Sequence, residues 1–217
     1  MLRTAIIDWR IFQYESGTDE QYVLKEVLID WCYDFDFKAD DRVLNLGGHI
    51  GAFDIRAAGK VNTIVTVEPV KESYDKILKH LAINNIPNVC VINKAVGKYN
   101  GTAKFWLWIN NGHNGLMENV EPTEDVIEVE TIALQQLLQH PITKIKCDIE
   151  GGEYEIFEDL TIPDSVNEMR LETHTFTEEQ GMKHDRLIGD FRQQGFKVEV
   201  IDNDAPHYRT YLVHCTR

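Results

Sequence analysis

The sequence has few cysteines, and none of them form a recognisable motif. The four are Cys32, Cys90, Cys147 and Cys215. They lie far apart without a CxxC pair, which argues against a zinc knuckle or a disulfide framework and is typical of a reducing cytoplasm. Because Cys90 and Cys147 fall in β-like apolar runs, we expect both to be small core residues.

Long apolar runs are also missing. No stretch approaches the roughly 20 apolar residues of a membrane span. The first ten residues contain only a short apolar run, broken by Asp8 and Arg10, so they do not resemble a secretory signal. We therefore expect a cytoplasmic protein without a membrane partner.

Basic residues are scarce. The chain has 22 Lys and Arg against 36 Asp and Glu, which gives a formal net charge of −14. Proteins that bind a nucleic-acid duplex cluster Lys and Arg to replace the counterions of the phosphates. The sequence contains no such cluster, so we expect a small-molecule substrate and no nucleic-acid partner.

The 217 residues, 43% of them hydrophobic, are enough for one globular domain with a sizeable core. Residues 3–15 are β-like, and residues 18–33 repeat apolar side chains at helical spacing after a predicted capping box, Thr18 to Gln21. We interpret residues 1–39 as an N-terminal strand and helix cap, followed by a main domain over residues 40–217.

The main domain alternates strands and helices. Predicted strands are 43–46, 63–67, 89–93, 145–149 and 168–173, and predicted helices are 52–58, 73–84, 152–160 and 177–194. Two final strands, 196–201 and 211–215, form an expected antiparallel pair. This pattern predicts an α/β fold with a mostly parallel sheet and helices on both faces.

One segment, residues 101–130, interrupts the alternation. It contains two strand-like runs around a Gly- and Asn-rich loop and is predicted to be an inserted hairpin. It would overhang the carboxyl edge of the sheet, where α/β proteins bind ligands. The loop at 110–117 and the aromatic run 105–108 are therefore candidates for an acceptor site, although a packed or dimer-facing strand is the favoured explanation of the aromatic run.

A glycine turn follows the first strand of the main domain. Gly47, Gly48 and Gly51 allow the backbone to approach a ligand closely at the start of a helix. Glu68 ends the next strand, where an acid can hydrogen-bond a ribose diol. Both features favour a cofactor that contains adenosine. NAD is disfavoured because Leu46 stands where GxGxxG needs its first glycine, and a purely structural turn remains the alternative.

Six segments together resemble the FkbM-type methyltransferases. They are residues 45–51 (NLGGHIG), 68–69 (EP), 93–97 (NKAVG), 114–117 (NGLM), 146–153 (KCDIEGGE) and 172–174 (ETH). Asn45 stands where the family usually has Asp. The resemblance implies a Rossmann-like class I methyltransferase fold, a seven-stranded sheet of order 3-2-1-4-5-7-6 and S-adenosylmethionine as methyl donor. The implied cofactor-binding residues are Asn45, Gly47, Gly48, His49, Gly51, Glu68, Pro69, Asn93 and Ala95.

Four polar residues are candidates for catalysis. Asp148 and Glu150 are expected two apart on one strand, Glu172 and His174 repeat this arrangement on the next, and these strands are neighbours in the implied sheet order. We predict His174 as general base, since imidazole titrates near neutral pH. Its alternative is a hydrogen-bonded histidine at a strand end, and that of Asp148 is a helix cap. We predict no metal site, with Mg²⁺ held by this cluster as the alternative.

The resulting hypothesis is a methyltransferase that uses S-adenosylmethionine to methylate a hydroxyl of a small acceptor, such as a sugar or a natural product. Methylation of nitrogen or carbon, a non-catalytic cofactor-binding module and an NAD-dependent oxidoreductase are the alternatives. A homodimer is left open.

Overall fold

A seven-stranded sheet forms the centre of the protein. The computed structural model describes residues 1–30, 33–108, 124–175, 177–204 and 209–217. The strands of this sheet are β3 (Arg42–Leu46), β4 (Thr63–Val67), β5 (Val89–Ile92), β9 (Lys144–Cys147), β10 (Glu168–Thr175), β11 (Lys197–Asp204) and β12 (Arg209–Thr216).

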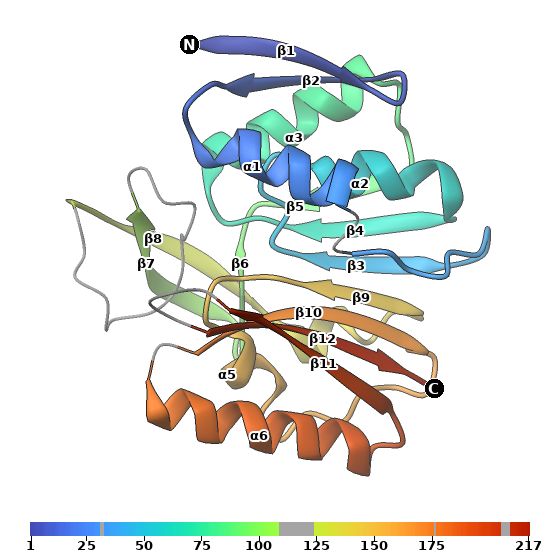
Figure 1. The fold of residues 1–217 in the computed structure, drawn as a ribbon, viewed down its shortest axis with the longest axis vertical. Coiled ribbons are helices and arrows are strands. Elements are labelled where there is room, and N and C mark those ends of the chain that lie inside the picture. The colour runs from blue at the N-terminus through green and yellow to red at the C-terminus, as the bar shows by residue number, and fades with distance from the viewer. Residues whose placement is uncertain (31–32, 109–123, 176, 205–208) are drawn as a thin grey trace.

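These strands lie in the order β11-β12-β10-β9-β3-β4-β5 (Figure 1). The pairs from β10 to β5 are parallel, whereas β12 is antiparallel to both β10 and β11. Numbered in chain order from β3, the arrangement is 3-2-1-4-5-7-6, which agrees with the expected order. The carboxyl ends of the parallel strands therefore meet at one edge of the sheet.

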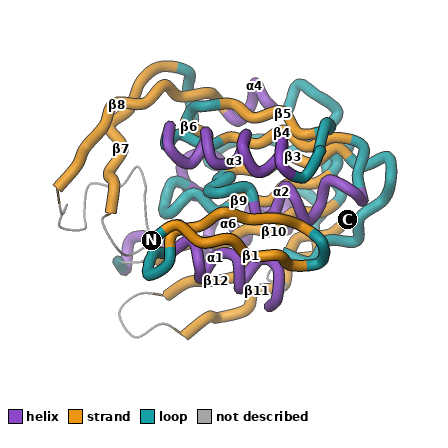
Figure 2. Tube along the Cα trace, turned by 90° about the horizontal axis from the view of Figure 1, so that it is seen from above, coloured by secondary structure: helices purple, strands orange, loops and turns teal. Residues whose placement is uncertain are grey.

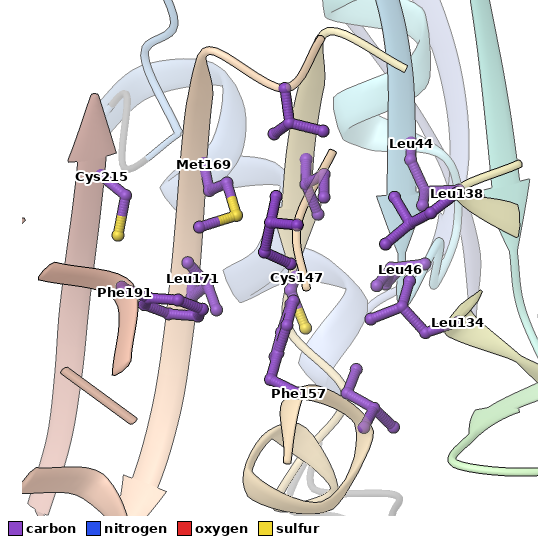
Figure 3. Close-up of a cluster of buried hydrophobic side chains, with 14 of the residues drawn as sticks. Leu44, Leu46, Leu134, Leu138, Cys147, Phe157, Met169, Leu171, Phe191 and Cys215 are labelled. Atoms are coloured by element: carbon purple, nitrogen blue, oxygen red, sulfur yellow. The ribbon is translucent and has the colours of Figure 1, made fainter. Parts of the chain in front are cut away.

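Helices cover both faces of this sheet. One face carries α1 (Asp19–Lys25), α2 (Ala52–Ala57) and α3 (Lys71–Ile83), and the other carries α4 (Leu134–Leu137), α5 (Glu153–Phe157) and α6 (Glu178–Gln193). Val43 of β3 packs toward the first set, whereas Leu44 and Leu46 pack toward the second (Figure 3). A central parallel strand is buried on both faces, and every residue of β3 after Arg42 is buried.

The N-terminal segment docks on the first of these faces. β1 (Leu2–Ile7) and β2 (Arg10–Glu15) form an antiparallel hairpin that lies along α3 (Figures 1 and 2). The N–H of Ile11 donates to Asn84 Oδ1 at 2.8 Å, and the N–H of Gln13 donates to His80 Nε2 at 2.9 Å. Phe12 is fully buried between these bonds. Long-range hydrogen bonds therefore hold the hairpin in place.

A smaller sheet projects beside the central one (Figure 1). It consists of β6 (Ala95–Gly97), β7 (Gly101–Trp108) and β8 (Glu124–Ala133) in the order β6-β8-β7, and β7 pairs with β8 antiparallel. β7 and β8 correspond to the two strands of the predicted insertion. The loop at 110–117 lies outside the described residues.

Two further expectations concern membrane-spanning helices and the burial of the cysteines. In the described ranges, no helix has both the length and the apolar character needed to cross a bilayer. Cys147 and Cys215 are buried free thiols, but Cys90 is exposed, so the prediction of a core residue is wrong for Cys90. Its strand, β5, is at the edge of the sheet, where less of the surface is covered.

Candidate functional site

A pocket opens at the carboxyl ends of β3, β4 and β9. Residues 47–49, 68–70 and 148–150, which follow these three strands, line it. The empty space in the pocket is about 970 Å³, a volume that includes the open solvent at its mouth. The N-terminal segment closes one side through Val23, Glu26, Val27 and Tyr33. The pocket lies where α/β sheets generally bind ligands.

The turn after β3 forms part of the pocket wall, and it can take its shape only because Gly47 and Gly48 have no side chains. Gly47 has a φ of +83°, and a Cβ there would overlap the carbonyl oxygen of Asp148. A Cβ on Gly48 would lie 2.5 Å from Thr66 Cγ2 and 2.8 Å from Ile77 Cδ1. Both glycines line the pocket, whereas Gly51 packs against Ile77 behind it. We therefore assign Gly51 to the shape of the turn.

Glu68 connects this turn to the end of β4. Its carboxylate accepts hydrogen bonds from the N–H groups of His49 (2.8 Å) and Val70 (2.9 Å). Burial raises the pKa of Glu68 above its ordinary value, and these backbone donors oppose the rise. His49, which lines the pocket, takes the left-handed φ of 49° that brings its N–H to Glu68. Glu68 is thus fixed at the pocket wall by main-chain groups.

Pro69 and Ala95 also line the pocket, as expected. Asn93 lies behind it, where its Nδ2 donates to the carbonyl oxygens of Glu68 and Pro69 at 2.9 Å each. Asn93 therefore supports the turn after β4 and is not among the pocket-lining residues.

Asn45, one of the expected cofactor-binding residues, is not among the residues that line the pocket. Its Nδ2 donates to Asp54 Oδ1 of α2 at 2.8 Å, and Thr66 Oγ1 donates to the same oxygen at 2.6 Å. Side chains alternate along a strand, and Asn45 shares the face of Val43, toward α2. Burial raises the pKa of Asp54 to about 6, so the amide supports an acid in the core.

The four predicted catalytic residues do converge. Asp148 and Glu150 line the pocket. His174 Nε2 lies 3.2 Å from Glu150 Oε2 and 3.7 Å from Glu172 Oε1. β9 ends at Cys147, so Asp148 and Glu150 lie in the following turn, and the prediction that both lie on the strand is wrong. Glu150 has a φ of 60°, and this left-handed conformation places its side chain next to His174.

The predicted role of His174 as general base does not fit its surroundings. The side chain is 2% exposed. Burial alone would lower its pKa, but the negative charges of Glu150 and Glu153 raise the pKa of His174 well above 6.5. The imidazole therefore carries a proton at neutral pH and cannot accept another, because both nitrogens are already protonated. His174 instead supplies positive charge to the carboxylates around it.

The carboxyl groups differ in their protonation. Burial would raise the pKa of Asp148, but the positive charges of Lys146 and His174 and a hydrogen bond from Tyr33 hold it below its usual value. Burial and the charge of Asp148 raise the pKa of Glu172 to about 8. At neutral pH, Asp148 is ionised and can accept a proton, whereas Glu172 is mostly protonated.

Two pocket residues, Tyr33 and Lys146, were absent from the predicted site. The Tyr33 hydroxyl lies 3.0 Å from Asp148 Oδ2 and 2.8 Å from Glu172 Oε2. Lys146 Nζ donates to the Gly47 carbonyl at 2.9 Å and lies 4.9 Å from the Tyr33 ring centre. Lys146 opens the KCDIEGGE motif and could have been found from it. Tyr33 had no such signal, because it follows the apolar pattern of an N-terminal helix.

Asp148, Glu150 and His174 place ligand atoms within 4.8 Å of one another, which is close enough to surround a metal ion. In the structure His174 Nε2 lies 3.2 Å from Glu150 Oε2. We therefore describe the group as an ion-paired cluster.

The sheet order, the glycine turn and the acid after β4 define the Rossmann-like fold of class I methyltransferases. The sequence matches the Methyltransferase FkbM domain over residues 45–198. This match covers more than half of the chain, which therefore belongs to the FkbM methyltransferase family. Family membership implies the use of S-adenosylmethionine.

Solved structures share this fold. The FkbM methyltransferase of Methylobacillus flagellatus KT has a TM-score of 0.56 at 12% identity, over 83% of this chain and 44% of that one. The chain thus spans less than half the length of that relative. A precorrin-6y C5,15-methyltransferase from Geobacter metallireducens GS-15 has a TM-score of 0.55 at 11% identity, over 99% of this chain and 100% of that one.

TYW2 of M. jannaschii, solved in complex with AdoMet, has a TM-score of 0.51 at 13% identity, over 99% of this chain and 84% of that one. At such identities the likeness shows the fold alone. No curated protein matches the chain.

Proposed function

We propose that the protein transfers a methyl group from S-adenosylmethionine to a hydroxyl oxygen of a small acceptor, such as a sugar or a natural product. One observation carries the proposal: the glycine turn, the fixed acid Glu68 and the ionised Asp148 border the same pocket. A cofactor held by the first two would thus present its reactive end near the third.

The residues present fit S-adenosylmethionine. Gly47 and Gly48 have no Cβ that would collide with Asp148, Thr66 or Ile77, so the turn packs closely against these residues and presents its backbone to the pocket. Each oxygen of Glu68 accepts one backbone N–H and keeps a lone pair for a ribose hydroxyl. Val70, Ala95 and other apolar side chains offer a surface for adenine. When bound, the cofactor supplies a methyl group activated by a sulfonium.

The chain's own part in the reaction is to orient the acceptor and remove its proton. In this proposal Asp148 would receive the hydroxyl proton of the acceptor, while the glycine turn and Glu68 would hold the cofactor that supplies the methyl group. General-base assistance of this kind contributes typically about 10²–10⁴-fold to a rate. Glu150, which also lines the pocket, would hold a second hydroxyl of the acceptor.

The charges of the pocket favour a neutral acceptor. Among the described lining residues, Glu26, Glu68, Asp148 and Glu150 are acidic. Lys146 is 4% exposed, and its ammonium is already bound to the Gly47 carbonyl. A phosphate or carboxylate on the acceptor would meet repulsion here, in line with the proposal of a small hydroxyl-bearing molecule and no nucleic acid.

Calorimetry with S-adenosylhomocysteine tests the cofactor site. We expect binding to the wild type and at least about tenfold weaker binding to Glu68→Ala, since a hydrogen bond to a charged group contributes about 1.5–3 kcal/mol. Glu72→Ala, an exposed acid on α3, is the matched control and should bind like the wild type. Equal affinity in all three proteins, or no binding at all, would contradict the assignment.

A hydroxyl-bearing acceptor panel then tests the reaction. Transfer of a labelled methyl group to oxygen, identified in the product by mass spectrometry and NMR, would support the proposal. Transfer to nitrogen or carbon would replace it. Cofactor binding without turnover over a broad panel would favour a non-catalytic binding module.

A further inference from the structure

The hydroxyl of Tyr33 lies between two carboxyl groups. Its oxygen is 3.0 Å from Asp148 Oδ2 and 2.8 Å from Glu172 Oε2. A phenol hydroxyl has a single hydrogen and can donate it to only one of them. With both carboxyl groups ionised, the other contact would set a lone pair of the phenol against a carboxylate oxygen. One of the two carboxyl groups must therefore contribute a proton of its own.

The surroundings identify Glu172 as the protonated group. Asp148 Oδ2 faces Lys146 Nζ at 3.4 Å, and this cation favours the ionised carboxylate. The charged groups that face Glu172 are Asp148 and Glu150 from the turn after β9 and His174 from its own strand. His174 Nε2 is nearer to Glu150, at 3.2 Å, than to Glu172, at 3.7 Å. Burial, and next the negative charges of Asp148 and Glu150, raise the pKa of Glu172 to about 8.

We infer that Tyr33 is a positioning residue that links a protonated Glu172 to an ionised Asp148 in one hydrogen-bonded chain. Glu172 donates its proton to the Tyr33 oxygen, and the Tyr33 hydroxyl donates to Asp148. The ring of Tyr33 is held edge-on to Phe53, with 6.3 Å between ring centres, and under the Lys146 ammonium. Tyr33 lies outside residues 45–198, the range that matches the family.

This chain of hydrogen bonds gives the N-terminal segment a part in the active site. Tyr33 stabilises the ionised form of Asp148, and a protonated Glu172 lets Tyr33 donate to Asp148 alone. The consequence for catalysis rests on the proposed function: Asp148 stays ready to receive the proton of the acceptor. Loss of the proton from Glu172 at higher pH would make Tyr33 divide its single hydrogen between two carboxylates.

Carbon NMR of the unliganded protein, with ¹³C in the side-chain carboxyl of glutamate, tests the inference directly. We expect one glutamate resonance that is protonated at pH 6 and titrates near pH 8, and that is absent in Glu172→Gln. In Tyr33→Phe its midpoint should fall by about one pH unit, because the protonated form loses its hydrogen-bond acceptor.

The direction of this shift is decisive. If Tyr33 only donated to an ionised Glu172, its removal would raise the midpoint. A rise, no change, or the absence of a glutamate that titrates above pH 6.5 would each overturn the inference. Tyr22→Phe, an exposed tyrosine of the same N-terminal segment, is the matched control and should leave the midpoint in place.

A second measurement does not need the Tyr33 variant to fold. A carboxyl group whose pKa is raised in the folded state contributes stability at low pH and loses it as the pH rises toward the folded pKa. The unfolding free energy of the wild type relative to Glu172→Gln should therefore fall between about pH 4.5 and pH 8 and level off above. A difference that stays constant over this range would overturn the inference. Because no cofactor or acceptor is present, failure here leaves the calorimetric test of the cofactor site untouched.

Discussion

The two ends of the pocket are built by different means. At the glycine end, the wall is backbone: Gly47 and Gly48 lack side chains, and main-chain N–H groups fix Glu68. At the acidic end, the wall consists of ionisable side chains from distant segments, including Tyr33 and Asp148. The glycine end therefore depends on local geometry and space, whereas the acidic end depends on charge and on where protons reside.

The largest effect is expected at Gly47, where the fold leaves no room for a side chain. Gly47→Ala should remove measurable binding of S-adenosylhomocysteine, because its Cβ would overlap the Asp148 carbonyl oxygen and the φ of +83° disfavours alanine. Gly17→Ala separates the two causes: its φ is +87°, but a Cβ there meets nothing within 4 Å. The control should lose only about 1–2 kcal/mol of stability and keep binding. Normal cofactor binding by Gly47→Ala would show that the turn has another role.

A large effect on turnover alone is expected at the acidic end. Asp148→Asn keeps the shape but removes the proton acceptor, so turnover should fall about 10²–10⁴-fold. Affinity for S-adenosylhomocysteine, measured by calorimetry, should change only a few-fold. If turnover survived and binding were lost instead, Asp148 would belong to the cofactor site, and the division between the two ends would disappear.

His174→Gln should mainly affect stability. Removal of the imidazolium leaves the buried Glu153 and its neighbours without positive charge, which costs about 3–5 kcal/mol for a broken buried pair. Since the pKa of His174 is raised in the folded protein, this stabilisation is complete below about pH 6.5 and is lost as the pH rises through the folded pKa. Urea unfolding of both proteins from pH 6 upward should show the difference shrink. An invariant difference would mean that His174 is neutral when folded.

Asn45→Asp should have the smallest effect, although it restores the usual family residue. A second carboxyl would then face Asp54, whose pKa is already raised to about 6 by burial. Like charges in a shared site disfavour ionisation, so we expect a loss of about 1–3 kcal/mol at pH 8 and less at pH 5. Improved cofactor binding without loss of stability would instead place residue 45 in the pocket.

Much of the fold and the glycine end could be predicted from the sequence. The alternation of strands and helices, the glycine spacing and the acid after β4 are local patterns. The structure that each one forms depends mainly on steric restrictions within a few residues. The roles at the acidic end could not be predicted. His174 was expected to accept a proton because of its ordinary pKa, but the carboxylates of Glu150 and Glu153 raise its pKa and reverse that expectation.

The position of a residue in the sequence was also less informative about its role than the residues that surround it in the fold. Asn45 lies in the expected glycine motif, yet the face of β3 on which it sits is covered by α2, so its side chain meets Asp54. Tyr33 reaches the site from far away in the sequence, and nothing in its local pattern sets it apart from the apolar residues of a helix.

Two segments with the same sequence pattern show most clearly the limit of prediction from local sequence. Thr18 to Gln21 and Thr177 to Gln180 both have the Thr-x-x-Gln pattern of a capping box. The box forms at α6, where the Gln180 N–H donates to Thr177 Oγ1 at 3.2 Å. The predicted box at α1 is wrong: Thr18 Oγ1 donates to the Glu15 carbonyl at 2.7 Å, because the end of β2 lies next to it.

The sequence alone thus determined the strands and helices, their succession along the chain and the glycine turn. These features follow from backbone sterics and from apolar periodicity over short distances. The tertiary structure decided which carboxyl group holds a proton, which histidine is charged and which tyrosine reaches the pocket. These properties depend on burial and on the charges of residues that only the folded chain brings within a few ångströms.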